Sequence, residues 1–216
     1  MLSQAQDQKQ KSPSDKWEIF GGYTFQRDYG MYNAFSFKGS SSSDAFAPFN
    51  ANGGQAAASY FPLRHFGLTY QMTFAGSGDR KINSTSDTQR IGTQSYLVGP
   101  AFRYAFKGGR LGKTSLFAHE LFGVTHNAFN ASSDNYAFCD DANGDPVLSC
   151  STNNFTLATG GGIDYRISRH VSIRPAQVEY WTEQIPEKDF NSYYSAESVK
   201  FGVNGLRYSA GAVVNF

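Results

Sequence analysis

Alternation between apolar residues and polar or small residues limits how this chain can fold more than any other feature. The alternation is clearest at the end of the chain, from Leu206 to Phe216. One parity carries Leu206, Tyr208, Ala210, Ala212, Val214 and Phe216, and the other carries Arg207, Ser209, Gly211, Val213 and Asn215. A period of two residues is that of a β-strand whose two faces lie in different surroundings. The segment is therefore predicted to be a strand of either a membrane-spanning sheet or a soluble sandwich.

The same alternation recurs along the chain and predicts eight strands in total. The other segments are residues 17–28, 53–63, 66–76, 91–106, 114–129, 154–167 and 171–182. In the segment 171–182 the apolar parity changes around Ala176 and Gln177, which predicts a β-bulge. In the segment 114–129 the charged residue Glu120 falls among the apolar residues. Either a bulge or a position near a membrane interface would resolve that conflict.

The connections between these strands alternate between long and short. The long connections are residues 29–52, 77–90, 130–153 and 183–199, and the short ones are residues 64–65, 107–113 and 168–170. All long connections then lie at one end, which predicts an all-β, antiparallel, up-and-down barrel of eight strands over residues 17–216. Residues 1–16 are polar and aperiodic, so we expect a disordered N-terminal tail. Because the start has no apolar stretch, the protein is either cytosolic or a mature protein whose signal peptide has been removed, and the second is favoured.

The composition separates the possible classes of protein. No apolar run approaches the ~18 residues that a transmembrane helix needs. The mean hydropathy of −0.45 is nevertheless compatible with transmembrane strands, which need apolar residues only at alternate positions. The net charge of +1 gives no electrostatic reason to bind nucleic acid. The 19 Phe and 13 Tyr residues favour a barrel with aromatic anchors at both membrane interfaces.

The two parities also predict which side of the barrel faces lipid. The apolar parity is nearly continuous, and a soluble barrel would have to expose it as a very large apolar patch. The polar parity is expected to point inward, where a ring of eight strands leaves room only for side chains. The charged residues predicted to form this interior network are Glu18, Arg103, His119, Asp164, Arg166, Arg174, Glu179 and Arg207. They form either an ion-paired plug or a narrow aqueous path, and an unpaired charge is so costly in this space that the plug is favoured.

Several segments resemble the small eight-stranded OmpA/OmpX-type outer-membrane barrels, in particular a subgroup found in acidobacterial sequences. These segments are Glu18–Tyr23, Val98–Phe102, Phe117–Val124, Gly160–Asp164 and Ser168–Pro175. The resemblance implies a location in the bacterial outer membrane, in contact with the lipid bilayer and lipopolysaccharide. The C-terminal pattern, with Tyr208, Val214 and the final Phe216, resembles the signal that the barrel-assembly machinery reads during insertion.

The resemblance is specific for the fold and says little about activity. We expect a non-enzymatic barrel, without cofactor or metal, that has a structural or surface-interaction role through its extracellular loops. A narrow pore for ions or small solutes is the alternative. Aromatic residues of the long connections, such as Tyr29, Phe35 and Tyr193, form either a recognition surface for a partner or a girdle close to the membrane.

The two cysteines of the chain, Cys139 and Cys150, lie in the third long connection. In an oxidising compartment they are expected to form a disulfide, and two free thiols are the alternative. The segment Asp141–Asp145 between them has oxygen ligands at alternate positions, as a Ca²⁺ loop would. Because Thr152 stands where a bidentate Glu would be needed, a solvated Asn-Gly turn is favoured instead.

One pattern raises the question of catalysis. His170 and Ser172 resemble the His-x-Ser pair of outer-membrane lipid A deacylases, with Glu179 as a conceivable third member. The pair stands beside a predicted short turn, whereas such an enzyme needs it at the outer leaflet and on the lipid face. We therefore expect no catalytic site here.

Overall fold

The computed structural model describes residues 16–33, 48–81, 88–106, 108, 112–132, 139–140, 146–185 and 201–216. Eight long strands form the wall of a barrel: β1 (Trp17–Asn33), β2 (Asn50–Tyr60), β3 (Phe66–Gly76), β5 (Thr88–Ala105), β6 (Thr114–Ala131), β9 (Ser149–Arg166), β10 (Val171–Ile185) and β11 (Phe201–Asn215). Three short strands lie outside the wall: β4 (Arg80–Lys81), β7 (Cys139–Asp140) and β8 (Pro146–Val147). β4 pairs with β5, and β7 pairs with β8.

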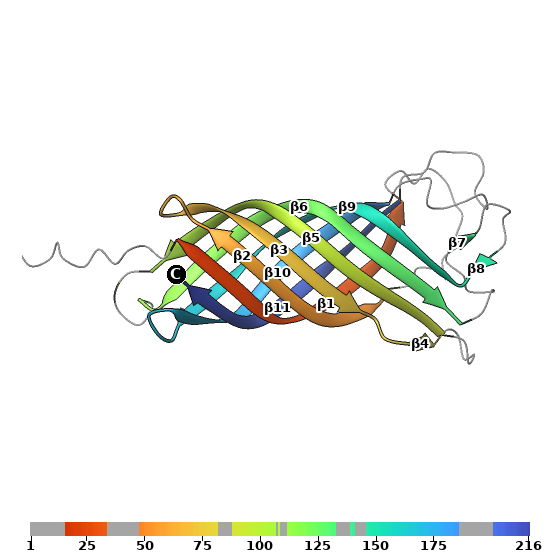
Figure 1. Cartoon of the computed structure of the whole chain (residues 1–216), viewed down its shortest axis with the longest axis horizontal. Coiled ribbons are helices and arrows are strands. Elements are labelled where there is room, and N and C mark those ends of the chain that lie inside the picture. The colour runs from red at the N-terminus through yellow and green to blue at the C-terminus, as the bar shows by residue number, and fades with distance from the viewer. Residues whose placement is uncertain are drawn as a thin grey trace, which may run out of the picture.

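Each strand of the wall pairs antiparallel with its neighbours along the chain, and the ring closes where β1 pairs with β11. At this seam the amide of Trp17 donates to the carbonyl of Phe216 at 3.3 Å, and the amide of Phe216 donates back at 3.0 Å. Figure 1 shows the strands tilted around a common axis, as closure of so small a barrel requires. The predicted eight-stranded, up-and-down barrel is confirmed.

The two ends of the barrel differ in their connections. Residues 61–65, 106–113 and 167–170 connect strands at the end that carries Trp17 and Phe216, which we call the short-turn end. Residues 34–49, 77–87, 132–148 and 186–200 connect strands at the opposite end, which we call the long-loop end. The short-turn end is on the left of Figure 1 and the long-loop end is on the right.

Most strands extend further at the long-loop end than their alternation predicted. β1 continues beyond Asp28 to Asn33 and β10 continues beyond Thr182 to Ile185, while β9 begins already at Ser149. Outside the membrane both faces of a strand meet polar surroundings, so strand pairing continues where the apolar parity does not. The predicted bulge in β10 is confirmed, because its register shifts against both neighbouring strands before Gln177.

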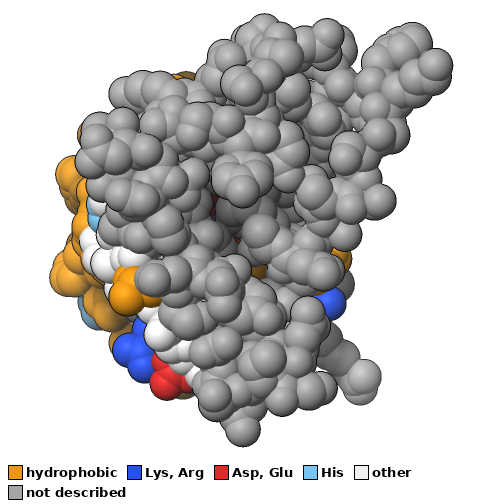
Figure 2. Space-filling model, turned by 90° about the vertical axis from the view of Figure 1, so that its right-hand side faces the viewer, with side chains coloured by type: hydrophobic (Ala, Val, Ile, Leu, Met, Phe, Trp, Pro, Cys, Tyr) orange, Lys and Arg blue, Asp and Glu red, His pale blue; other side chains and the backbone are white. Residues whose placement is uncertain are grey.

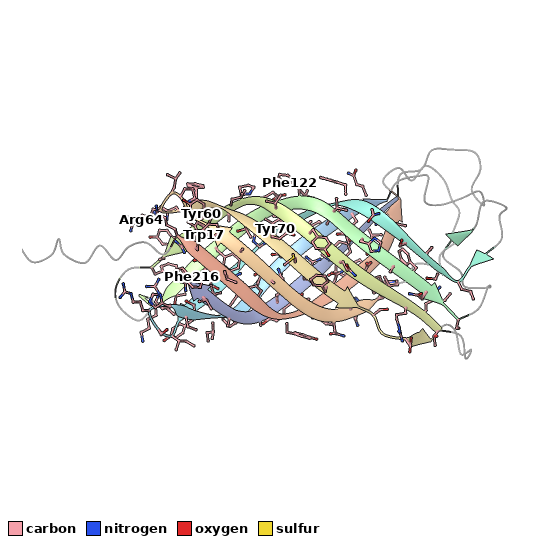
Figure 3. All side chains as sticks on the ribbon, in the orientation of Figure 1. Trp17, Tyr60, Arg64, Tyr70, Phe122 and Phe216 are labelled. Carbon is pink, nitrogen blue, oxygen red and sulfur yellow. The ribbon has the colours of Figure 1, made fainter. Side chains whose placement is uncertain are left out.

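The outer face of the wall exposes large apolar side chains. Ile19, Tyr23 and Leu68 keep 50%, 55% and 55% of their surface exposed. Figure 3 shows side chains standing outward along the whole wall, and Figure 2, which looks onto the long-loop end, shows hydrophobic side chains along its flank. Such a face is stable only against hydrocarbon, so the barrel spans a membrane. Among the described residues, no helix is long and apolar enough to cross a membrane.

Glu120 lies on this outer face, half-buried, between Ala118 and Phe122 of β6. The register of β6 against β5 and β9 runs through this position without a shift, so the suggested bulge is wrong. The hydroxyl of Thr159, the cross-strand neighbour on β9, donates a hydrogen bond to the Glu120 carboxyl. The conflict in the sequence is therefore real: a carboxyl group stands within the apolar face.

Candidate functional site

Polar and aromatic side chains fill the lumen, and they form three clusters that each contain one arginine. Nearest the short-turn end, Arg103 of β5 forms an ion pair with Glu18 of β1. The guanidinium group also lies over the ring of Phe61, with 4.2 Å between its central carbon and the ring centroid. An aromatic face attracts a cation more strongly when water is excluded. The carboxylate and the ring together therefore hold Arg103 in place.

The second arginine, Arg174 of β10, is held more rigidly. Its Nε and Nη2 donate to the two carboxylate oxygens of Asp164 at 2.7 and 3.0 Å, and its Nη1 donates to Gln177 at 2.8 Å. The guanidinium carbon lies 3.8 Å from the ring centroid of Phe117 and 4.6 Å from that of Phe20. A bidentate pair stacked between two rings fixes both the position and the plane of the guanidinium.

The third cluster is centred on Glu179, whose side chain is fully buried. Its carboxylate accepts from Gln71 at 2.9 Å and from Gln177 at 3.0 Å, and it lies 3.4 Å from Nη1 of Arg207. His119 Nε2 also lies 2.8 Å from the same carboxylate, at an angle unsuited to a hydrogen bond. His119 therefore lies in close contact with the carboxylate, whereas the glutamines donate hydrogen bonds to it directly.

Arg207 completes this cluster from β11. Its side chain is fully buried, and it donates twice to the side-chain oxygen of Gln26, at 3.1 and 3.3 Å. A weaker contact of 3.5 Å reaches the hydroxyl of Ser95. Strands on opposite sides of the ring thus contribute bonded polar side chains to the middle of the lumen.

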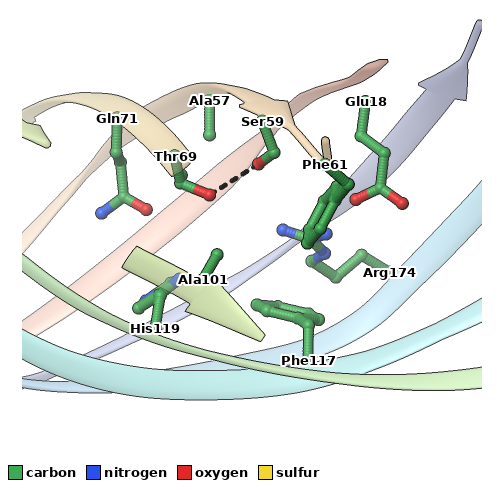
Figure 4. A pocket seen from close by; sticks show the side chains of 10 residues that line it. All are labelled: Glu18, Ala57, Ser59, Phe61, Thr69, Gln71, Ala101, Phe117, His119 and Arg174. Atoms are coloured by element: carbon green, nitrogen blue, oxygen red, sulfur yellow. Dashed lines mark hydrogen bonds between the residues drawn. The ribbon is translucent and has the colours of Figure 1, made fainter. Parts of the chain in front are cut away.

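A small cavity separates the Glu179 cluster from the short-turn end (Figure 4). Its lining residues are Glu18, Ala57, Ser59, Phe61, Thr69, Gln71, Ala101, Phe117, His119 and Arg174. The volume open to the centre of a water molecule is about 10 Å³, which is room for about one water. The hydroxyls of Ser59 and Thr69 lie 2.7 Å apart across the wall of the cavity.

Toward the long-loop end, the lumen contains an apolar layer and then a second polar group of side chains. An apolar layer of Leu97, Leu121, Ala158 and Trp181 is fully buried there. Beyond this layer, the Glu183 carboxylate accepts from the side-chain amides of Asn127 at 2.7 Å and Asn154 at 3.1 Å. The alternation ends the predicted strand at Thr182 and so leaves Glu183 in a loop. One parity of β10 carries Glu179, Trp181 and Glu183. Extending the predicted strand by two residues along this parity would have placed Glu183 in the lumen.

The structure places most of the predicted interior network inside the barrel. Glu18, Arg103, His119, Asp164, Arg174, Glu179 and Arg207 all take part in the clusters described above. Arg166 differs from the prediction, because it is exposed at the last position of β9. The alternation of β9 assigns Arg166 correctly to the inward parity. The strand ends beyond the filled part of the lumen, however, so the Arg166 side chain reaches solvent.

The structure does not bring together the residues of the deacylase pattern. His170 is exposed and its Nδ1 donates to the carbonyl of Asn215 at 3.1 Å. Ser172 accepts from the side-chain amide of Asn215 at 3.3 Å. Glu179 instead belongs to the buried cluster in the middle of the lumen. These three side chains therefore have separate structural roles.

Cys139 and Cys150 lie at the starts of β7 and β9, respectively. Cys150 is one half of a disulfide. The Cys139 side chain lies outside the described residues, so the pairing of these two cysteines stays a prediction. The suggested Asn-Gly turn in Asp141–Asp145 also lies outside them, as do the loop residues Phe35 and Tyr193.

The three residues of the predicted assembly signal all face outward from β11 or its end. Tyr208, Val214 and Phe216 are 44%, 37% and 62% exposed. The Tyr208 hydroxyl donates to the carbonyl of Pro175 at 2.7 Å, which ties β11 to the bulged part of β10. Their reading by the assembly machinery stays a prediction.

Comparison with known proteins gives similarity only at the level of solved structures. No family model and no curated protein matches the chain. The attachment invasion locus protein Ail of Yersinia pestis is 18% identical with a TM-score of 0.48, and the match covers 93% of this chain and 98% of that chain. The outer membrane protein OprG of Pseudomonas aeruginosa is 14% identical with a TM-score of 0.49, and the match covers 93% of this chain and 95% of that chain.

Proposed function

We propose that this bacterial outer-membrane barrel is not an enzyme and that its lumen is closed, so that it acts through its wall and its long connections. The observation that supports this most directly is the cluster around Glu179. Five buried side chains from four strands, including Arg207 and Gln71, converge there on one carboxylate. The function is then structural support of the envelope or interaction at the cell surface.

The alternative is a narrow path for ions or small solutes along the same charged groups. It would require the Glu179 cluster to part, because the cavity below it has room for about one water. Parting Glu179 from Arg207 would leave two buried charges without their partners, which is costly. The closed state is therefore expected to dominate at equilibrium.

Conductance of the refolded full chain in a planar bilayer tests the closed lumen. Insertion is first confirmed by a heat-dependent shift in gel mobility. The wild type is expected to be silent. Current steps from the double variant Glu179→Ala with Arg207→Ala would show that the central cluster closes the lumen, and silence from it would mean that the Arg103 and Arg174 clusters or the apolar layer also close it. Glu120→Gln is the matched control, because it changes a carboxyl outside the lumen. Reproducible steps from the wild type would refute the closed lumen and favour the pore.

We further propose that the long-loop end faces the cell exterior and that lipopolysaccharide and the barrel-assembly machinery are partners of this barrel. The resemblance of segments such as Glu18–Tyr23 to the acidobacterial subgroup of OmpA/OmpX-type barrels supports this orientation. Shortening the connection 186–200 distinguishes the two remaining roles. If the shortened barrel still inserts but cell adhesion changes, the role lies at the surface; unchanged adhesion favours structural support.

A further inference from the structure

Glu183 differs in its partners from three other carboxylates of the lumen. Glu18, Asp164 and Glu179 each form an ion pair with an arginine. Glu183 is only 1% exposed, yet among the described residues it makes no ion pair with a basic side chain. Its polar partners there include the neutral amides of Asn127 and Asn154. Amide donors satisfy oxygens but do not neutralise the charge. Arg207 acts on Glu183 only through space and is itself paired with Glu179, so the buried charge of Glu183 stays costly.

Two oxygens without partners lie in the same part of the lumen. The side-chain carbonyl of Asn154 and the hydroxyl of Thr152 are buried and have no hydrogen bond. Asn154 is fully buried and Thr152 is 4% exposed. Since the Asn154 amide nitrogen donates to Glu183, its carbonyl oxygen lies within a few ångströms of the same carboxylate. Thr152 is the direct cross-strand neighbour of Asn127, the other residue that bonds Glu183.

We propose that Glu183, Asn154 and Thr152 form a binding site for a hard metal cation inside the long-loop end of the barrel. A carboxylate, an amide carbonyl and a hydroxyl are the oxygen ligands that such cations take, with water completing the shell. Water alone would pair the two unbonded oxygens, but it would not neutralise Glu183. A cation does both, and it would tie β9 to β10 just beneath the long connections.

Only one of the three ligands is charged, so the site is expected to be weak. Calcium sites with few charged ligands have dissociation constants on the order of 10⁻⁴ to 10⁻³ M. Such an affinity suits the outside of a cell, where calcium is abundant, better than the cytoplasm. We therefore expect Ca²⁺ to bind in that range.

Trp181 supplies a reporter inside the protein. It precedes Glu183 by two residues on the same face of β10, which places the two roughly 7 Å apart along the strand, and it is fully buried. The other tryptophan, Trp17, lies at the opposite end and is 50% exposed on the outer wall. Terbium(III), a luminescent substitute for Ca²⁺, should therefore be sensitised through Trp181 when it occupies the site.

The test titrates the refolded full chain with Tb³⁺ under selective excitation of tryptophan. The expected result is saturable emission that Ca²⁺ displaces, that Trp17→Phe retains and that Trp181→Phe abolishes. Glu183→Gln removes the only charged ligand at constant shape and should weaken binding by about tenfold or more, because Ca²⁺ affinity depends on the number of charged ligands. Thr152→Val, which removes only the hydroxyl, should weaken binding by a smaller factor. This second variant tests the site independently if Glu183→Gln fails to fold.

Two controls make the result specific. Glu120→Gln makes the same chemical change outside the lumen and should leave Tb³⁺ binding unchanged. Replacing Asp141 and Asp145 by Asn removes the acidic residues of the third long connection and should also leave the Trp181-sensitised emission unchanged. Emission that survives Trp181→Phe, or binding that is unaffected by Glu183→Gln in a folded barrel, would overturn the proposal. Absence of binding in the wild type would do the same.

Discussion

We predict that Glu179 and Arg207, the charged residues of the central cluster, differ in how much unfolding free energy is lost when each is replaced by alanine. Glu179→Ala leaves the fully buried Arg207 with neutral oxygen partners in Gln26 and Ser95. An uncompensated buried charge of that kind costs about 3–5 kcal/mol of unfolding free energy. Arg207→Ala leaves Glu179 with two glutamine amides and His119 among its partners. A stranded carboxylate can also take up a proton, whereas a guanidinium cannot lose one, so this cost is expected to be lower, roughly 1.5–3 kcal/mol.

Equilibrium unfolding of the barrel in vesicles measures both effects. Trp181 is the fluorescent reporter in a Trp17→Phe background, because its fully buried ring leaves the lumen only when the barrel opens. The double variant should cost less than the two single variants added together, with a coupling of about 0.5–3 kcal/mol. Glu120→Gln combined with Arg207→Ala is the control and should be additive. Additivity of the Glu179 and Arg207 variants within about 0.5 kcal/mol would refute the reasoning.

Three further predictions concern other parts of the molecule. Glu120→Leu should raise the unfolding free energy by roughly 1–2 kcal/mol, because it removes an ionisable group from the lipid face at the cost of the hydrogen bond from Thr159. The same unfolding assay measures this change, and a lower unfolding free energy would contradict the prediction. Non-reducing gels and thiol alkylation should find no free thiol at Cys139 or Cys150, and alkylation of both cysteines before reduction would contradict their pairing. Phe216→Ala should lower the amount of barrel recovered in the outer-membrane fraction while the refolded barrel keeps its stability, whereas equal recovery would argue against an assembly signal.

The sequence predicted the wall of the barrel better than its contents. A period of two determines which side chains share a face, so alternation alone places Ile19 and Leu68 outward, and Glu18 and Arg207 inward. The same pattern also locates the bulge before Gln177, because one extra residue reverses the parity.

What each inward residue meets depends on the stagger between strands, which no local pattern contains. Parity places Glu179 and Gln71 in the lumen, but only the register around the ring shows that they bond to each other. Parity likewise could not show that Arg166 lies past the filled part of the lumen. Glu183 was missed for a related reason: the apolar parity stops where the membrane stops, although the strand does not.

The meeting of Arg207 with Gln26 also has a consequence for the order of folding. These residues lie 181 positions apart, on the last and the first strand, and the Gln71 to Glu179 bond spans 108 positions. Contacts between such distant residues form slowly, because the intervening chain must be ordered first. Arg207 can reach Gln26 only when β11 has paired with β1, so the buried cluster and the seam are completed together. In a barrel left open at the seam, Arg207 and Glu179 would be only partly bonded. The buried cluster therefore penalises incomplete ring closure during insertion.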